Sequence, residues 1–228
     1  MPNRDLCDIT VVLDRSGSMA AVAGDTIGGM NRFLEDQRKA PGAARLTLVQ
    51  FDNEYEPVHR AVPIAAVPPL TDGTFVPRGT TALLDATGRA IAETGARLAA
   101  LAEAERPGKV IFVIVTDGLE NASREFTRER VMGMISHQRD AYAWQFVFLG
   151  ANQDAIASAA TLGIQGTHAM TYAHTGAGTA AAFAAVSRGT ARARSEAAPA
   201  AAAAFFEPAD REEQERHGAK PGTPPAGP

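Results

Sequence analysis

The segment 14–18 reads Asp-Arg-Ser-Gly-Ser and directly follows the apolar run at 9–13. Its alternating pattern directs the side chains of Asp14, Ser16 and Ser18 to one side of a tight turn, where Gly17 gives the backbone freedom. A carboxylate and two hydroxyls are hard oxygen donors, which suit a small hard cation such as Mg²⁺. A serine-glycine turn after a strand is also common as a plain turn, so this motif alone leaves both interpretations open.

Two further segments favour the metal site. The apolar run at 110–115 is typical of a strand buried on both faces, and it is followed by Thr116-Asp117-Gly118. The segment 78–85 places a glycine turn and the pair Thr80 and Thr81 in front of a long helix. A threonine at that position can cap the helix or offer its hydroxyl to a metal.

A parallel sheet would bring Asp14 and Asp117 together although they lie far apart in the chain. Ligands of open parallel sheets bind beyond the carboxyl ends of the strands, where the strand order reverses. If the strands at 8–13 and 110–115 are neighbours there, their ends lie about 5 Å apart. Both carboxylates would then face one small volume.

Together these residues resemble the von Willebrand factor A (vWA) domain and its metal-ion-dependent adhesion site (MIDAS). The family site combines an Asp-x-Ser-x-Ser motif, a distant threonine and a Thr-Asp-Gly aspartate, and all three occur here in family order. The resemblance covers about residues 5–194 and implies the metal ligands Asp14, Ser16, Ser18, Thr81 and Asp117. Thr81 best fits the family spacing, with Thr80 as the alternative.

The resemblance implies a protein-binding module rather than an enzyme. Mg²⁺, with Mn²⁺ or Ca²⁺ as alternatives, would keep one coordination position for an Asp or Glu carboxylate of a partner protein. Some bacterial cytoplasmic members act beside chaperone-like ATPases or in stress-response assemblies, which makes these the partner classes that the family suggests. Glu120, Asn121, Asn152 and Gln153 could shape the rim of the site, although a solvated loop is the simpler interpretation for each.

Two alternatives use the same Asp/Ser cluster. The first is a Mg²⁺-dependent hydrolase or phosphoryl-transfer enzyme. It is disfavoured because Ser16 occupies the position two residues after Asp14, where this chemistry would need a second carboxylate. The sequence also has no nucleophile elbow, phosphate loop or dinucleotide fingerprint. The histidines at 59, 137, 168, 174 and 217 show no metal-ligand spacing and are interpreted as surface residues. The second alternative is a purely structural metal site.

Composition is that of one ordinary globular domain with a tail. The chain has 228 residues, 45% of them hydrophobic and 21% charged, with a formal net charge of −4. No dense basic patch predicts nucleic-acid binding, and no segment predicts a membrane span or a signal peptide, so a cytoplasmic location is expected. Residues 195–228 are rich in Ala, Pro and Gly and predict a mostly disordered tail, with Phe205-Phe206 as incidental aromatics or a short docking element.

Strand and helix patterns alternate along residues 5–194. This alternation predicts an α/β fold, a doubly wound and mostly parallel sheet with helices on both faces. The strand at 55–62 is expected to pair back as an antiparallel edge. The remaining expected strands are 8–13, 46–51, 110–115, 144–149 and 168–171, and the expected helices are 26–39, 82–105, 128–139, 154–162 with Asn152 as N-cap, and 179–194.

Overall fold

The computed structural model describes residues 1–151, 154–196 and 204–220. Its centre is a six-stranded sheet in the order β3-β2-β1-β4-β5-β6. All neighbouring pairs are parallel except β2 with β3, which forms the antiparallel edge that the sequence predicts. The strands are β1 (Asn3–Asp14), β2 (Ala43–Phe51), β3 (Tyr55–Pro63), β4 (Pro107–Thr116), β5 (Gln145–Ala151) and β6 (Ala169–Tyr172).

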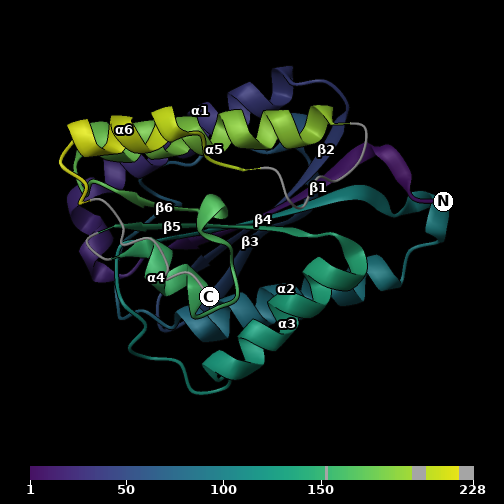
Figure 1. Cartoon of the computed structure of the whole chain (residues 1–228), viewed down its shortest axis with the longest axis horizontal. Coiled ribbons are helices and arrows are strands. Elements are labelled where there is room, and N and C mark those ends of the chain that lie inside the picture. The colour runs from purple at the N-terminus through teal and green to yellow at the C-terminus, as the bar shows by residue number, and fades with distance from the viewer. Residues whose placement is uncertain (152–153, 197–203, 221–228) are drawn as a thin grey trace.

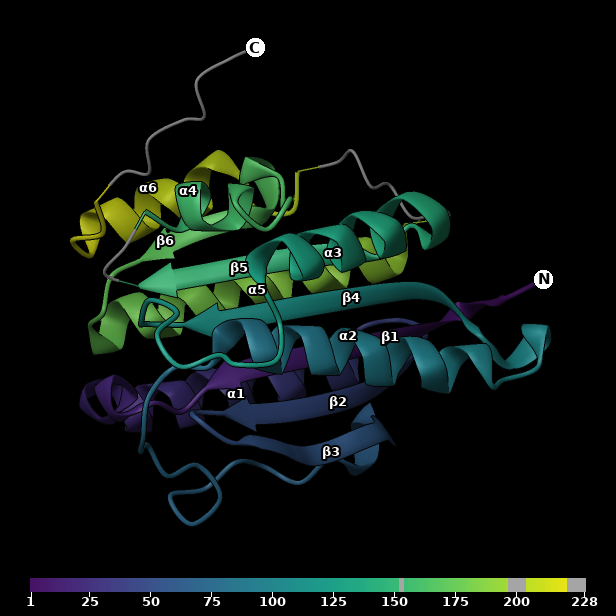
Figure 2. The same ribbon diagram turned by 90° about the horizontal axis from the view of Figure 1, so that it is seen from below.

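Helices cover both faces of the sheet. Figure 1 shows α1, α5 and α6 above the sheet and α2 and α3 below it, and Figure 2 shows the strand order from the lower side. The α-helices are α1 (Ala23–Lys39), α2 (Leu83–Ala99), α3 (Arg128–Tyr142), α4 (Ala155–Ala160), α5 (Gly176–Ser195) and α6 (Pro208–Arg216). Short 3-10 helices are η1 (Gly17–Val22), η2 (Ile64–Ala66), η3 (Glu103–Glu105) and η4 (Gly166–His168).

The side chains of the central strands pack into two separate hydrophobic cores, one on each face of the sheet. Alternation along β1 sends Ile9, Val11 and Leu13 to the face of α1 and α5, whereas Val12 joins the face of α2 and α3. Because both faces are covered, β1 and β4 read as near-continuous apolar runs in the sequence. The predicted doubly wound α/β fold is therefore confirmed.

The strand order reverses between β1 and β4. Leu13 on β1 pairs with Val115 on β4, and β1 pairs with β2 on its other side. The carboxyl ends of β1 and β4 therefore lie side by side at the switch point, as the sequence predicts. The turns that carry Asp14 and Asp117 leave the sheet at this edge.

Helix α2 is shorter than its sequence pattern predicts. Leu84, Ile91 and Leu98 form a buried stripe along it, but the helix ends at Ala99 instead of Glu105. The guanidinium of Arg106 donates to the carbonyls of Ala99 and Leu101, which satisfies carbonyls that a longer helix would have paired internally. In the middle of the helix, Gly88 leaves room for the ring of Phe126, because a Cβ there would lie 2.3 Å from that ring.

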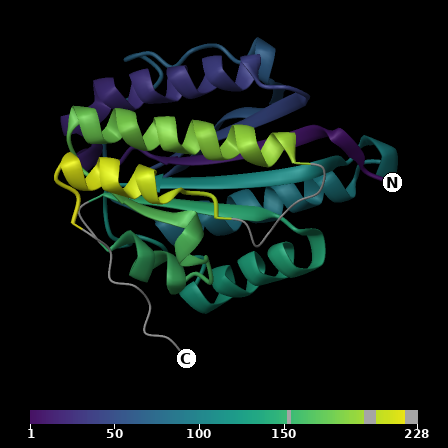
Figure 3. The same cartoon turned by 45° about the horizontal axis from the view of Figure 1, so that its top comes forward.

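The C-terminal part of the chain is more ordered than expected. In place of a disordered tail, residues 204–220 form a segment whose Phe205 and Phe206 are buried in the core with α1 and α5, followed by α6. Figure 3 shows α6 lying beside α5. Burying two adjacent aromatic rings provides the free energy that a tail without an apolar period otherwise lacks. Phe205 and Phe206 themselves are not helical.

None of the helices in the described ranges combines the length and apolar character that crossing a bilayer requires.

Candidate metal site

The first motif forms a tight turn at the end of β1. Asp14 is fully buried, and its Oδ1 accepts a 2.6 Å hydrogen bond from the backbone N–H of Ser16. The Oγ atoms of Ser16 and Ser18 lie 3.2 Å apart. Gly17 has no left-handed backbone conformation, so the freedom expected of it is not used. The turn instead places the carboxylate and both hydroxyls close together, as the sequence predicts.

The end of β4 meets this turn directly. Ser18 Oγ donates a 2.7 Å hydrogen bond to Oδ1 of Asp117, and Thr116 Oγ1 donates one of 2.6 Å to Oδ2 of Asp14. The structure thus brings together residues that lie 99 and 102 positions apart in the chain. Figure 2 shows β1 and β4 side by side, which is the arrangement that makes these contacts possible.

Thr81 lies against the second of these strand ends, whereas Thr80 does not. Thr81 is 3% exposed, and a Cβ built on Gly118 would lie 3.0 Å from its Oγ1. Thr80 is exposed and lines a neighbouring cavity. The Thr81 hydroxyl is also not needed to cap helix α2, because Glu120 and Ser123 accept hydrogen bonds from the first backbone amides of that helix. These observations favour Thr81 over Thr80 as the threonine of the site.

Glu120 and Asn121 do more than line a solvated loop. The Asn121 side chain accepts a 3.0 Å hydrogen bond from the backbone N–H of Thr81, and the Asn121 backbone N–H donates to the Thr81 carbonyl. Glu120 accepts from the backbone of Leu84, Ala122 and Ser123. Together they fasten the threonine segment to the loop after β4. The other two rim residues, Asn152 and Gln153, lie outside the described residues.

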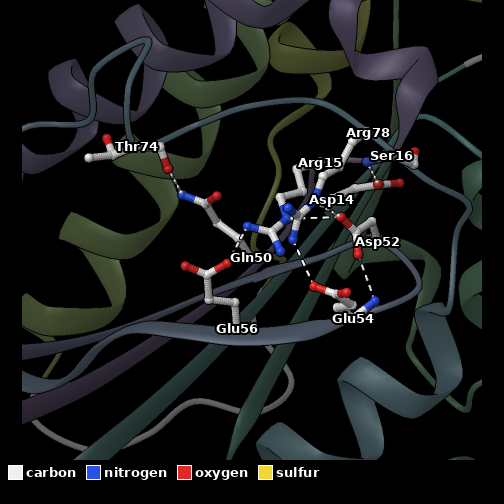
Figure 4. A network of polar contacts seen from close by, with 9 residues as sticks. All are labelled: Asp14, Arg15, Ser16, Gln50, Asp52, Glu54, Glu56, Thr74 and Arg78. Atoms are coloured by element: carbon white, nitrogen blue, oxygen red, sulfur yellow. Dashed lines mark hydrogen bonds and ion pairs between the residues drawn. The ribbon is translucent and has the colours of Figure 1, made fainter.

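Sequence reasoning missed an ionic hub beside the first motif. Asp52, 1% exposed, accepts from the guanidiniums of Arg15 at 3.2 Å and Arg78 at 2.9 Å (Figure 4). Arg15 also reaches Glu56 at 2.5 Å, and Arg78 reaches Glu54 at 2.8 Å. The hub ties the Asp14 turn to the loop that carries Thr81. The one available signal was that Asp52 directly follows β2, the neighbour of β1.

Backbone hydrogen bonds complete the link between these two loops. The N–H of Arg78 donates to the Arg15 carbonyl at 2.7 Å, and the N–H of Gly17 donates to the Gly79 carbonyl at 3.2 Å. Gly79 has a φ of +67°, and a Cβ on it would lie 2.2 Å from Asn53 Oδ1. Any other side chain would be strained at this φ and would press on Asn53, so the glycine turn predicted before the threonine pair has a steric reason.

Two of the five histidines are not surface residues. His168 is 5% exposed, and burial lowers its pKa. His174 follows β6, and its Nε2 lies 3.0 Å from Oδ2 of Asp117, with side-chain exposures of 16% and 0%. The two atoms are at ion-pair distance without hydrogen-bond geometry, and neither has a hydrogen-bond partner within the described residues. No spacing rule in the sequence pointed to this contact, because β6 and β4 are separated by β5.

The electrostatics of the site favour a cation. The pKa of Asp14 is raised to about 6, because burial and the charge of Asp117, which both raise it, outweigh the hydrogen bonds from Thr116 and Ser16, which lower it. Burial also raises the pKa of Tyr172 far above its ordinary value, and the nearby charges of Asp117 and Asp14 add to the shift. Buried negative charge of this kind costs free energy unless a positive group pairs with it.

The donor set fits a hard cation bound by oxygen. Two carboxylates and three hydroxyls gather at this edge, and Asp117 Oδ2 is a buried acceptor without a hydrogen bond from the described residues. No three His, Cys, Asp or Glu side chains in the described ranges cluster closely enough to hold a metal by themselves. A cation here would therefore depend on the serine and threonine hydroxyls, which suits Mg²⁺ or Mn²⁺ better than softer metals.

Several solved structures share this architecture. The chain superposes on the vWF domain of the type V pili tip protein Mfa5 from Porphyromonas gingivalis with a TM-score of 0.58 and 13% identity, covering 83% of this chain and 96% of that one. A superposition that covers most of both chains decides the fold. The chain has the vWA fold. At this identity the likeness extends to the fold alone.

Other structural neighbours are larger proteins. For VWA2, an ArnB paralog from Sulfolobus acidocaldarius, the TM-score is 0.51 with 14% identity, covering 79% of this chain and 44% of that one. For proximal thread matrix protein 1 from the mussel byssus the TM-score is 0.54 with 16% identity, covering 82% of this chain and 46% of that one. This chain therefore spans less than half of either protein. No protein-family model matches its sequence, and no curated protein does either.

Proposed function

We propose that this vWA domain is a protein-binding module that holds a divalent cation, Mg²⁺ or Mn²⁺, and captures an acidic side chain of a partner protein. The observation that carries the proposal is the 2.7 Å contact between Ser18 Oγ and Asp117 Oδ1, which gathers donors from two strand ends at the ligand-binding edge of the sheet. Ser16, Ser18 and Thr81 would contribute neutral hydroxyls, and Asp14 and Asp117 would contribute charge.

The neutral hydroxyls explain why such a site would attract a carboxylate. A bound Mg²⁺ or Mn²⁺ supplies a positive centre with a position open to an incoming oxygen ligand. Ser16, Ser18 and Thr81 add no negative charge to that of Asp14 and Asp117, because a hydroxyl carries no formal charge. Asp14 and Asp117 are held back from solvent by burial and by the bonds from Thr116 and Ser18. The chain's own carboxylates therefore do not crowd the face that a partner would approach.

The surroundings of the site offer a surface for the rest of a partner. Leu119, directly after Gly118, is 66% exposed and gives an apolar contact at the rim. Thr80 and Asn121 line an open cavity of about 750 Å³ beside the site, between the start of β3 and the loop after β4. Residues that flank a partner's acidic side chain would find room and polar partners there.

The arrangement gives less support to the hydrolase alternative. A serine nucleophile is activated by a base within hydrogen-bond reach, most often an imidazole. Here Ser18 donates to a carboxylate, and His174 lies on the far oxygen of that carboxylate. Turnover of generic phosphate esters that disappears in Ser16→Ala would favour the enzyme instead.

The cytoplasmic location and the chaperone-like or stress-response partners stay predictions.

Two measurements test the proposal. Calorimetric titration with MnCl₂ and MgCl₂ should show one site in the wild type and none in Asp14→Ala, with the exposed Asp72→Ala as control. Water-proton relaxation of the Mn²⁺-loaded protein should then fall when a glutamate-containing peptide displaces bound water, but not with its glutamine analogue. A wild type that binds neither metal, or a relaxation signal indifferent to the carboxylate, would overturn the proposal.

A further inference from the structure

The turn between β6 and α5 reaches the metal site through His174. Its Nε2 lies 3.0 Å from Oδ2 of Asp117, while Oδ1 of the same carboxylate accepts from Ser18. The two oxygens of Asp117 are thus divided between the turn and the site. With the ring proton on Nε2, a rotation of the imidazole that aligns its N–H with Oδ2 converts this contact into a hydrogen bond.

Helix α6 holds this turn from the other side. Gln214 is 1% exposed, its Oε1 accepts from the backbone N–H of Ala173 at 3.1 Å, and its Nε2 donates to the carbonyl of Gly178 at 3.0 Å. These two bonds bracket His174 on either side in the chain. A single buried amide from α6 therefore sets the spacing of the backbone that carries the imidazole.

Helix α6 is itself anchored to α5. Arg188 on α5 donates to Asp210 on α6 at 2.6 Å, and Arg192 donates to the Phe205 carbonyl at 2.6 Å. The Phe205 ring packs where Gly189 has no side chain, since a Cβ there would lie 2.5 Å from the ring. Figures 1 and 3 show α6 alongside α5. The position of Gln214 is therefore fixed by contacts that do not involve the metal site.

We propose that His174 is a positioning residue for Asp117, and that α6 keeps it in place through Gln214, so that the C-terminal segment 204–220 sets the affinity of the metal site. This inference rests on the proposed function. A carboxylate free to rotate presents its oxygens in many orientations, whereas the imidazole 3.0 Å from Oδ2 limits that rotation and keeps Oδ1 directed toward Ser18. Partners that orient a metal-binding side chain typically contribute about 10- to 100-fold in metal affinity.

Calorimetric titration with MnCl₂ of the full chain tests the inference. His174→Leu should weaken binding about 10- to 100-fold. His174→Gln, which keeps an N–H donor at similar reach, should recover most of the affinity. Gln214→Met, which keeps the volume but loses both hydrogen bonds, should weaken binding by roughly 2- to 30-fold. The double variant His174→Leu/Gln214→Met should bind no more weakly than His174→Leu alone, because both changes break the same connection from Gln214 through His174 to Asp117.

The controls separate positioning from general damage. Glu215→Gln, on the exposed side of α6, and His137→Gln, on α3, should leave the affinity unchanged. Thermal melting in EDTA identifies a variant that fails to fold, and His174→Gln then carries the test. Affinities equal to wild type in His174→Leu, or purely additive losses in the double variant, overturn the positioning role while the proposed function stands. A wild type without Mn²⁺ binding overturns both.

Discussion

Oγ of Ser18 donates a 2.7 Å hydrogen bond to Oδ1 of Asp117, across 99 positions of sequence. The contact exists because β1 and β4 are neighbours at the point where the strand order reverses. It joins a hydroxyl from the first turn to a carboxylate that is 0% exposed at its side chain. The same fold feature therefore creates the proposed binding site and the buried negative charge that the fold must accommodate.

Asp14→Asn should stabilise the metal-free protein and abolish metal binding. Asparagine keeps an oxygen for the Ser16 N–H, and its amide can donate to Thr116 Oγ1 once that hydroxyl turns its single proton from residue 14 to the Gly118 carbonyl, 3.1 Å away. Removing a fully buried charge should raise the free energy of unfolding by roughly 1–3 kcal/mol at neutral pH. Urea unfolding in EDTA measures it, with the exposed Asp72→Asn as control. A variant less stable than wild type in EDTA would contradict the prediction.

The stability of the metal-free protein should depend on Asp14 between about pH 4 and 6. Its pKa is about 6 in the folded state against an ordinary value of 3.8, so the folded state binds the proton more tightly. The contribution of Asp14 to the free energy of unfolding, roughly 3 kcal/mol, is fully present below pH 4 and is lost as the pH rises through 6. The difference between wild type and Asp14→Asn in urea unfolding should therefore grow from pH 4 to 7. A difference independent of pH would count against it.

Saturating Mn²⁺ should reverse this trend. A cation beside ionised Asp14 compensates its charge, so the stabilisation that metal gives should be larger at pH 7.5 than at pH 5. Thermal melting with and without MnCl₂ at both pH values measures the effect. The Asp14→Asn variant serves as the matched control, since its melting temperature should not respond to metal at either pH.

Asp52→Ala should destabilise the fold and weaken the metal site together. The substitution leaves the buried guanidinium of Arg15 without one carboxylate partner and releases Arg78, at a cost of roughly 3–5 kcal/mol. Glu54→Gln is the matched control, because its ion pair with Arg78 is 65% and 52% exposed and is screened by water, so its loss should change the free energy of unfolding little. Urea unfolding and MnCl₂ titration measure both effects. Equal stabilities of the two variants would contradict a structural hub at Asp52.

Much of the fold and the gathering of the proposed site residues could be predicted because both depend on local patterns. The apolar runs before Asp14 and Asp117 identify buried parallel strands, and the ends of such strands meet at one edge. The contacts of Asp52, Glu120 and His174 could not be predicted in the same way. Each joins a polar side chain to a group far along the chain, and a polar residue after a strand looks like any loop residue. Whether the gathered residues bind metal stays a prediction.

The C-terminal helix was missed for a different reason. An Ala/Pro/Gly-rich segment without an apolar period predicts disorder, and this pattern hides α6. A local signal was present, however. Glu207 and Asp210 form a capping box around Pro208 at the first helical position, and this combination marks a helix start. Capping residues are therefore better guides than apolar period where a helix is held mainly by polar contacts.

Phe205→Ala should destabilise the whole domain. The ring is 4% exposed and packs against Gly189 of α5, so its loss leaves a cavity and costs about 3–5 kcal/mol in unfolding free energy. A side chain in a disordered tail would change stability by no more than about 0.5 kcal/mol. Urea unfolding distinguishes the two, with Leu119→Ala, 66% exposed, as the apolar control. If Phe205→Ala were as stable as wild type, residues 204–220 would instead be the disordered tail that their composition predicts.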